Sequence, residues 1–416
     1  MIELSPETRT AIAVALFALT YVGMAAGRVP WLTLDRTGIA LIAAIAAVAL
    51  GVLPVDAVAP AIDFTTLAIL FALMVLSAQF GLAGFYDWCA AQIARAEGSA
   101  ARLLALTIIV AGVLSAVLVN DIVVFAMTPV LCAALKERGL DPRPFLAGLV
   151  GAANAGSAAT IIGNPQNILI GAVGRLDFVH FFTVCAPPAI VALALTYFTV
   201  RLVWRSALAA PPAYPDAGIE RPDRAQTAKA AIATAAMIVL LLTPAPRALG
   251  LLAIAALLLI SRRHATRQVT GMVDWHLLLL FASLFIVNAA FETTGLPAAA
   301  LDWLARNGLL PDRLGVLAPL SLVMSNTIGN VPAVVMLLSL WHTPPAGALY
   351  GLAVLSTLAG NLFLVGSIAN LIVAERAQAS GVRFGFWDHA RAGVPLTLVS
   401  MALACLWFYA TGMMAL

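Results

Sequence analysis

Four short polar segments interrupt the apolar stretches of this sequence, and their side chains are the ones best suited to bind a solute or an ion. The segments are 120–121, 154–167, 325–332 and 360–370. Glycine and proline in them interrupt helices and free backbone groups, while amides and hydroxyls supply neutral donors and acceptors. The predicted binding residues are Asn120, Asp121, Asn154, Ser157, Thr160, Gly163, Asn164, Asn167, Ser325, Asn326, Thr327, Asn330, Gly360, Asn361, Gly366, Ser367 and Asn370.

The chemistry that these segments favour is the binding of small ions. Freed carbonyl oxygens suit a small cation such as sodium, and helix N-termini that point inward suit an anion. For any single residue, hydrogen bonding between packed helices is an equally good explanation, but it explains four segments in matching positions less well. The candidate sodium ligands are Asn120, Asp121, Gly163, Asn326 and Gly366.

Asp121 is the acid that the pattern places near the centre of a lipid bilayer. An ionisable group at that depth is costly and is a functional hypothesis by default. Its carboxylate would bind sodium or exchange a proton, and a capped or ion-paired structural aspartate is the alternative. We predict no basic residue at this depth. An anionic substrate would therefore be held by neutral dipoles and a bound cation, or the substrate is uncharged.

The composition explains why polar residues are so informative here. Of 416 residues, 62% are hydrophobic and only 10% are charged, which excludes a soluble globular domain and a disordered chain. The apolar runs are continuous, which favours membrane helices over a barrel. Four scattered cysteines and five histidines form no metal or redox motif, and no nucleotide-binding loop or catalytic constellation is present. We therefore expect no enzyme, no organic cofactor and no nucleic-acid partner.

The apolar blocks predict ten membrane crossings and two hairpins that enter and leave on one side. The hairpins are assigned to 103–134 and 314–341, because each is too long for one span and has polar residues in its middle. The predicted spans are 10–27, 37–53, 64–82, 146–170, 182–204, 229–243, 247–261, 275–294, 347–374 and 391–413.

The positive-inside rule gives this arrangement an orientation. With the 28–36 loop inside, 18 of the 23 Lys and Arg residues fall on the inner side and 5 on the outer side. We therefore predict a protein of the inner (plasma) membrane with both termini outside. The Pro-rich 205–227 linker is predicted to be cytoplasmic.

The two halves of the chain show the same order of elements, and local sequence echoes accompany it. Asp63 and Asp274 each begin a third span, and an Asp-Trp pair follows each of these spans, at 87–88 and 302–303. An odd number of crossings per half inverts the second half relative to the first. The expected fold class is an all-α polytopic membrane protein with two inverted repeats of five transmembrane helices, each with a re-entrant hairpin and a broken helix. Its predicted parts are repeat 1 (1–204), a linker (205–228) and repeat 2 (229–416).

At these motifs the chain resembles the superfamily of citrate-transporter-like permeases, which includes divalent anion:sodium symporters, arsenite efflux pumps and some sodium:proton antiporters. Residues 325–327 match the Ser-Asn-Thr motif of the symporter hairpins, and 163–167 is similar to their first broken-helix motif. Residues 119–121 (Val-Asn-Asp) and the Gly-Ser-Ile-Ala segment at 366–369 look more like the pumps and antiporters. The resemblance implies that hairpins and broken helices bind the sodium ion and the substrate and move against a scaffold that contains the interface, for which a homodimer is the expected form.

We therefore expect a secondary active transporter of a small inorganic or di- or tricarboxylate anion, coupled to sodium or protons by alternating access. An arsenite or antimonite efflux permease and a sodium:proton antiporter are the alternatives. A membrane-embedded enzyme or a channel is a rival from another class, and saturable countertransport would distinguish a transporter from a channel.

Overall fold

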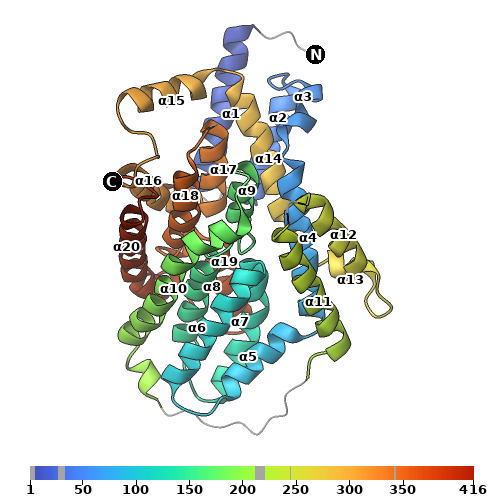
Figure 1. Ribbon diagram of the computed structural model, residues 1–416, viewed down its shortest axis with the longest axis vertical. Coiled ribbons are helices and arrows are strands. Elements are labelled where there is room, and N and C mark those ends of the chain that lie inside the picture. Colours follow the sequence, from blue (N-terminus) through green and yellow to red (C-terminus); the bar gives the residue numbers. More distant parts are fainter. Residues whose placement is uncertain (1–4, 27–32, 211–220, 244, 342) are drawn as a thin grey trace.

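The computed structural model describes residues 5–26, 33–210, 221–243, 245–341 and 343–416, and in these ranges the chain is helical with no strand (Figure 1). The predicted all-α membrane fold is confirmed at this level. The helices are α1 (Pro6–Ala26), α2 (Arg36–Ala49), α3 (Val55–Ala61), α4 (Phe64–Leu82), α5 (Phe85–Arg95), α6 (Ala100–Val117), α7 (Asn120–Glu137), α8 (Arg143–Ser157), α9 (Pro165–Val173), α10 (Phe178–Val203), α11 (Arg224–Leu241), α12 (Arg247–Leu259), α13 (Thr266–Thr270), α14 (Trp275–Glu292), α15 (Leu296–Arg306), α16 (Leu314–Thr327), α17 (Asn330–Leu340), α18 (Ala346–Ala359), α19 (Ile368–Ala379) and α20 (Phe386–Ala410), with 3-10 turns η1 (Ala207–Ala209) and η2 (Leu364–Gly366).

Each predicted span corresponds to a helix or to a broken pair of helices. Seven of the described helices are long and apolar enough to cross a membrane: α1, α4, α6, α10, α11, α14 and α20. The predicted spans 146–170 and 347–374 are the pairs α8–α9 and α18–α19, which polar segments interrupt. The short helices α3 and α13 were not predicted. Arg28 and the central linker residues 211–220 lie outside the described residues.

Aspartate side chains fix where several of these helices begin. Asp63 accepts a hydrogen bond from the Thr66 N–H at the start of α4, and Asp274 accepts one from the Leu277 N–H at the start of α14. Such caps satisfy N–H groups that have no partner within the helix and contribute about 1 kcal/mol each. The third predicted span of each half thus begins with an aspartate N-cap.

The two predicted hairpins are present as antiparallel helix pairs. Only residues 118–119 separate α6 from α7, and only 328–329 separate α16 from α17. Gly329 has a φ of 99°, a conformation that L side chains rarely adopt, so glycine is suited to this tight connection. Helices α16 and α17 have 14 and 11 residues and span about 21 and 16 Å, less than the roughly 30 Å of a bilayer core.

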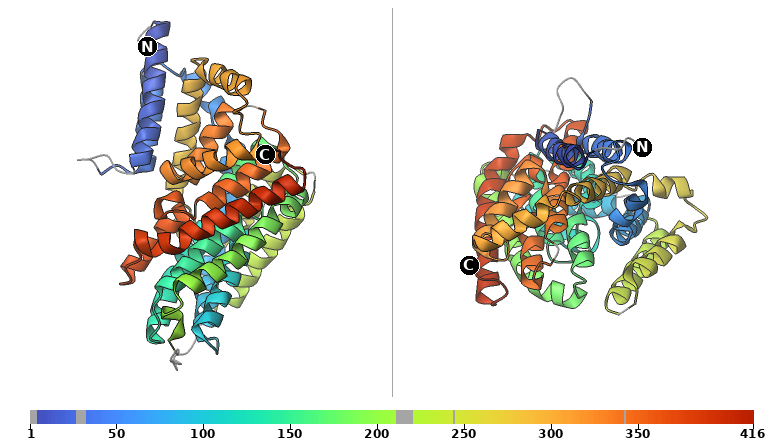
Figure 2. Two further views of the ribbon diagram at one scale, coloured as in Figure 1. Left: turned by 90° about the vertical axis from the view of Figure 1, so that its left-hand side faces the viewer. Right: turned by 90° about the horizontal axis from the view of Figure 1, so that it is seen from above.

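The helices form two groups. The scaffold helices, α1, α2, α4, α11, α12 and α14, pack mainly on one another, and α1 lies at the edge of the molecule (Figure 2). The hairpin helices, α6–α10 and α16–α20, pack into a second body, and its helices α7, α9, α16 and α17 touch α1, α4 and α14 of the first. Helices α5 and α15 occupy matching places in the two halves of the sequence and lie toward opposite ends of the molecule (Figure 1).

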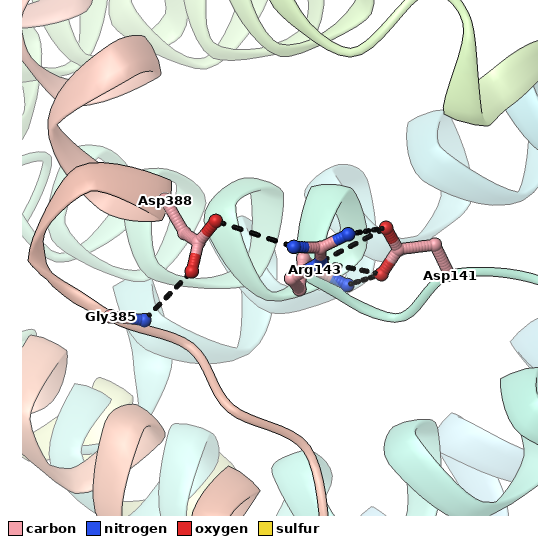
Figure 3. Close-up of polar contacts among 4 residues, drawn as sticks. All are labelled: Asp141, Arg143, Gly385 and Asp388. Atoms are coloured by element: carbon pink, nitrogen blue, oxygen red, sulfur yellow. Dashed lines mark hydrogen bonds and ion pairs between the residues drawn. The ribbon is translucent and has the colours of Figure 1, made fainter.

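An ion-pair chain fastens the beginning of α8 to the beginning of α20 (Figure 3). The Arg143 guanidinium lies 2.7 Å from the Asp141 carboxylate and 3.6 Å from that of Asp388. Asp388 also accepts a hydrogen bond from the Gly385 N–H at 3.0 Å. This contact joins the first half of the chain to the second within the hairpin helices.

Candidate substrate and ion site

Asn154, on the last turn of α8, lies at the centre of a buried polar network that joins the two halves of the chain. Its side-chain amide donates to Asn361 Oδ1 at 2.8 Å and to Asn370 Oδ1 at 3.0 Å. Its Oδ1 accepts from Ser367 Oγ at 3.2 Å and from Asn120 Nδ2 at 3.5 Å. Asn154 is fully buried. One side chain therefore links four of the predicted site residues, from hairpin 1 (α6–α7) and the second broken helix.

The first break, between α8 and α9, is filled by its own polar side chains. Asn164 Nδ2 donates to Ser157 Oγ at 3.0 Å and to Thr357 Oγ1 at 3.2 Å. Asn164 Oδ1 caps α9 by accepting from the Asn167 N–H at 2.9 Å. Gln166 Nε2 donates to the same Thr357 hydroxyl at 3.1 Å. The N-terminus of α9 thus opens into the buried network.

The two breaks are closed by the same hydrogen bonds. Asn167 Nδ2 donates to the carbonyls of Ser157 and Thr160, ten and seven residues earlier, at 3.2 and 3.0 Å. Asn370 Nδ2 donates to the carbonyls ten and seven residues before it, at 2.7 and 3.0 Å. Residues 163–167 and 366–370 therefore have the same local hydrogen-bond geometry.

Each hairpin tip is pressed against a glycine of a break. A Cβ on Gly163 would lie 2.8 Å from the Ser115 carbonyl oxygen, and a Cβ on Gly366 would lie 2.5 Å from Asn326 Oδ1. The Gly163 carbonyl also accepts from the Asn120 N–H at 3.1 Å. Both glycines permit an approach that no other residue would allow.

The structure corrects the register of the first hairpin motif. Residues 325–327 are the last three of α16, and residues 115–117 are the last three of α6. Asn120 and Asn330 are both first in the returning helix. By position in the hairpin, the counterpart of Ser-Asn-Thr is therefore Ser-Ala-Val at 115–117 and not Val-Asn-Asp at 119–121. The shared Ser115 and Ser325 were a signal that would have fixed this alignment.

Two predicted residues lie apart from the network. The Thr327 side chain is exposed, and its hydroxyl bonds a carbonyl of its own helix at 2.9 Å. Asn330 is buried, and its Oδ1 accepts from the neighbouring Val331 N–H at 3.0 Å. Ser325 Oγ bonds the carbonyl of Ser356 on α18 at 3.3 Å. Hairpin 2 (α16–α17) thus brings Asn326 to the break and attaches Ser325 to α18, while Thr327 and Asn330 bond their own helices.

Asp121 lies away from the network although its neighbour Asn120 belongs to it. Its side chain lines a separate cavity with Asp274, between α7 and α14. The predicted sodium set therefore divides, with Asn120, Gly163, Asn326 and Gly366 at the breaks and Asp121 at the scaffold.

Several buried polar atoms in the network have no hydrogen-bond partner among the described residues. They are the Oδ1 atoms of Asn120 and Asn167, Oγ of Ser115, Oε1 of Gln166, Nδ2 of Asn361 and Nδ1 of His389. Buried polar atoms are almost always satisfied, so such a set indicates a place for a ligand or water. Four of the six are oxygen atoms, the ligand type that a hard cation such as sodium prefers.

The sequence interpretation missed three polar residues of the network. Thr357 and Gln166 join the breaks of the two halves, and His389 Nε2 lies 2.8 Å from the Asn361 carbonyl. Gln166 stood within a predicted motif, but Thr357 and His389 sit in apolar stretches without a motif. Only the packing of α18 and α20 brings them to the site.

A basic residue of the scaffold helices also lies against hairpin 2. Arg36, at the start of α2, was assigned to a surface loop. Its Nη1 would lie 3.0 Å from a Cβ on Gly329, the tip of hairpin 2, and its Nε donates to the Met24 carbonyl at 3.2 Å. The scaffold therefore presents one guanidinium to the tip of this hairpin.

Buried polar breaks in a helical membrane fold are typical of membrane transporters. The citrate transporter family model matches residues 14–347, and the chain belongs to this family. It is 26% identical to an uncharacterised transporter of Mycobacterium tuberculosis (strain H37Rv), over 96% of this chain and 98% of that protein. It is 27% identical to the silicon efflux transporter LSI3 of Oryza sativa subsp. japonica, over 90% of this chain and 92% of that protein.

A solved structure shares the fold. The crystal structure of the Alcanivorax borkumensis YdaH transporter, described as having an unusual topology, superposes with a TM-score of 0.54 and covers 97% of this chain and 98% of its own. At 16% sequence identity this similarity concerns the fold alone.

Proposed function

We propose that this protein is a secondary active transporter that moves a small inorganic or di- or tricarboxylate anion, coupled to sodium or protons. The observation that carries the proposal is the single buried network around Asn154, where both breaks meet. A solute bound there contacts both halves of the chain. Sites at the midplane between repeats, built from interrupted helices, are typical of secondary transporters.

The anion is supported by two features. The N-termini of α9 and α19 begin inside the network, and helix N-termini offer N–H groups and a favourable dipole to negative charge. Arg36 adds one positive charge beside the tip of hairpin 2. The unpartnered oxygens of Asn120, Asn167 and Ser115 offer a place for the coupling cation close to that anion.

The proposed mechanism is alternating access with two inverted repeats, 1–204 and 229–416. The matched hydrogen bonds at the two breaks and the opposite ends occupied by α5 and α15 support the inversion (Figure 1). The hairpin helices would move against the scaffold helices and carry the network with them. We further propose the inner (plasma) membrane, a homodimer, both termini outside and a cytoplasmic 205–227 linker.

A ligand screen tests the proposed function. Purified protein is heated in citrate, dicarboxylates, sulfate, arsenite, sodium or lithium, because a ligand that binds only the folded state raises the unfolding temperature. An anion whose effect grows when sodium is added supports symport. Stabilisation by none of the anions, with saturable sodium or lithium binding, would instead support a sodium:proton antiporter.

An arsenite or antimonite efflux permease remains the second candidate. The Asn-Asp pair at 120–121, which looks like that of the pumps, favours it. A resistance assay in cells that lack their own pump separates efflux from uptake. Labelling of single cysteines in the 205–227 linker from outside the cell would contradict the proposed orientation.

A further inference from the structure

A cavity at the junction of the two helix groups is not part of the neutral network. It has a volume of about 270 Å³ and lies where α7 of the hairpin helices faces α14 of the scaffold helices. Its walls are mostly apolar, with Met74 from α4, Phe125 from α7 and Ile372 from α19. Two carboxylates, Asp121 and Asp274, line the same space.

Asp121 has no partner within the described part of the chain. Its side chain is 8% exposed, and no hydrogen bond or ion pair involves its carboxylate. Asp274 uses Oδ1 to cap α14, accepting from the Leu277 N–H at 2.9 Å. Its Oδ2 has no partner among the described residues. A buried carboxylate without a partner is stabilised by a proton or by a compensating cation, and none of the residues that line the cavity is basic.

The opposite junction holds a matching cavity. It has a volume of about 260 Å³ and is lined by Asp63, Phe285, Val335 and Leu169. Asp63 caps α4 as Asp274 caps α14, and the other three come from α14, α17 and α9, the counterparts of α4, α7 and α19. The two cavities are thus built by the same four kinds of element.

The cavities differ at the hairpin position. Asp121 is the second residue of α7, and the second residue of α17 is Val331. The acid in the other cavity besides Asp63 is Glu292, which belongs to the scaffold helix α14. Only the cavity near hairpin 1 therefore pairs a carboxylate of the hairpin helices with one of the scaffold helices.

We propose that the cavity between Asp121 and Asp274 binds a monovalent cation, sodium, which bridges the hairpin helices to the scaffold helices. Two carboxylates supply the charged oxygens, and the remaining volume holds water that completes the coordination shell. Sodium is chosen because it is a coupling cation of the proposed transport; the described residues contain no group of three or more His, Cys, Asp or Glu that could hold a metal ion. This inference rests on the proposed transport function and assigns its coupling ion a second site.

Bridging gives the cation a mechanical role. Two like charges in one apolar cavity repel each other, and a cation between them turns the repulsion into attraction. Sodium would therefore favour the conformation in which α7 lies against α14, and separation of the two groups would release it. The positive side chain of Arg376, over the Phe125 ring at 3.9 Å, lies on α19 and does not line the cavity.

The test is sodium binding to purified full-length protein at constant pH and ionic strength, measured with radioactive sodium and by thermal unfolding. The variants are Asp121→Asn and Asp274→Asn, which keep shape and remove charge, with the exposed Asp302→Asn as the control. We expect each cavity variant to lower the sodium affinity of this second site by about tenfold or more. The control variant should leave sodium binding unchanged. Potassium and magnesium should not compete.

Other results overturn the proposal. Unchanged sodium binding in Asp274→Asn would remove the scaffold from the site and leave any sodium at the breaks. Competition by magnesium at equal concentration would assign the cavity to a divalent cation. Because binding needs no transported solute, a protein that binds sodium here but moves no anion contradicts the proposed function and not this site.

Discussion

The two hairpins reach equivalent glycines by different chemistry. Hairpin 2 closes its break with a side chain, since Asn326 donates to the Ala359 carbonyl at 2.8 Å and accepts from the Phe363 N–H at 3.2 Å. Hairpin 1 has Ala116 at that position, and there the Ala116 carbonyl accepts from Thr160 Oγ1 at 2.6 Å. The Asn326 amide of hairpin 2 is therefore used in hydrogen bonds that close the second break.

Hairpin 1 keeps its polar atoms available. Asn120 Oδ1 and Ser115 Oγ are buried and have no hydrogen-bond partner among the described residues, and Asp121 follows Asn120 directly. The comparison teaches that equal backbone geometry does not give equal binding capacity. We infer that hairpin 1 supplies ion ligands and that hairpin 2 serves mainly to lock its break.

Replacing Asn154 should have the largest effect, because both halves depend on it. Asn154→Ala removes contacts to four side chains and leaves Asn361 and Asn370 with fewer partners. We expect a loss of about 2–4 kcal/mol in the free energy of unfolding and no detectable transport. Thermal or denaturant unfolding measures the first and proteoliposome flux the second. The control is Asn307→Ala, on an exposed residue that ends α15.

The two break glycines should differ in their tolerance of a methyl group. In Gly163→Ala the new Cβ meets backbone carbonyls, including that of Ser115 at 2.8 Å, which cannot easily move. In Gly366→Ala it meets the Asn326 side chain at 2.5 Å, which can shift, and the Gly360 carbonyl oxygen at 2.9 Å, which cannot easily move. We expect a cost of about 2–3 kcal/mol for the first and about 1–2 kcal/mol for the second.

Unfolding of both glycine variants, with Gly315→Ala as the control, measures this difference. A Cβ on Gly315 would come no closer than 3.8 Å to another part of the chain. Equal losses in the free energy of unfolding would mean that the contacts around the two glycines are equally rigid.

The hairpin amides should separate stability from ion binding. Asn326→Ala removes the lock of the second break and should lower the free energy of unfolding by about 1–3 kcal/mol with sodium affinity retained. Asn120→Ala removes one long contact of 3.5 Å and should change stability by less than about 1 kcal/mol while weakening sodium binding. Sodium titration and unfolding of the same two preparations give both quantities. Weaker sodium binding in Asn326→Ala with unchanged affinity in Asn120→Ala would contradict the different roles proposed for the two hairpins.

The smallest effect is expected at the helix caps. Asp63→Ala and Asp274→Ala each remove a cap and should each cost about 1 kcal/mol. Only the Asp274 variant should also weaken sodium binding, since Asp63 uses both carboxylate oxygens on Thr66. Similar sodium loss in both variants would show that the two cavities are equivalent.

Much of the fold was predictable from the sequence because lipid imposes a simple rule. Apolar blocks of bilayer length had to be helices, and α4 occupies the predicted range 64–82. The breaks were visible as Gly, Pro and Asn within such blocks. Short helices such as α3 gave no signal, because seven residues carry too little periodicity.

The sequence predicted many residues of the site but not which residues they contact. Asn154, Asn167 and Asn370 could be selected because polar residues are costly in apolar spans. That Asp121 would face the scaffold, or that Arg36 would reach Gly329, depends on contacts between distant segments. Periodicity within one segment carries no information on such contacts.

Solute counterflow in proteoliposomes tests the central claim most directly. Vesicles are loaded with the anion that gives the largest thermal shift, and uptake of the labelled anion is followed with wild type and Asn154→Ala. We predict transient, saturable accumulation for the wild type and none for the folded variant. Uptake that rises linearly with concentration, or equal counterflow by the variant, would contradict a transporter built around Asn154.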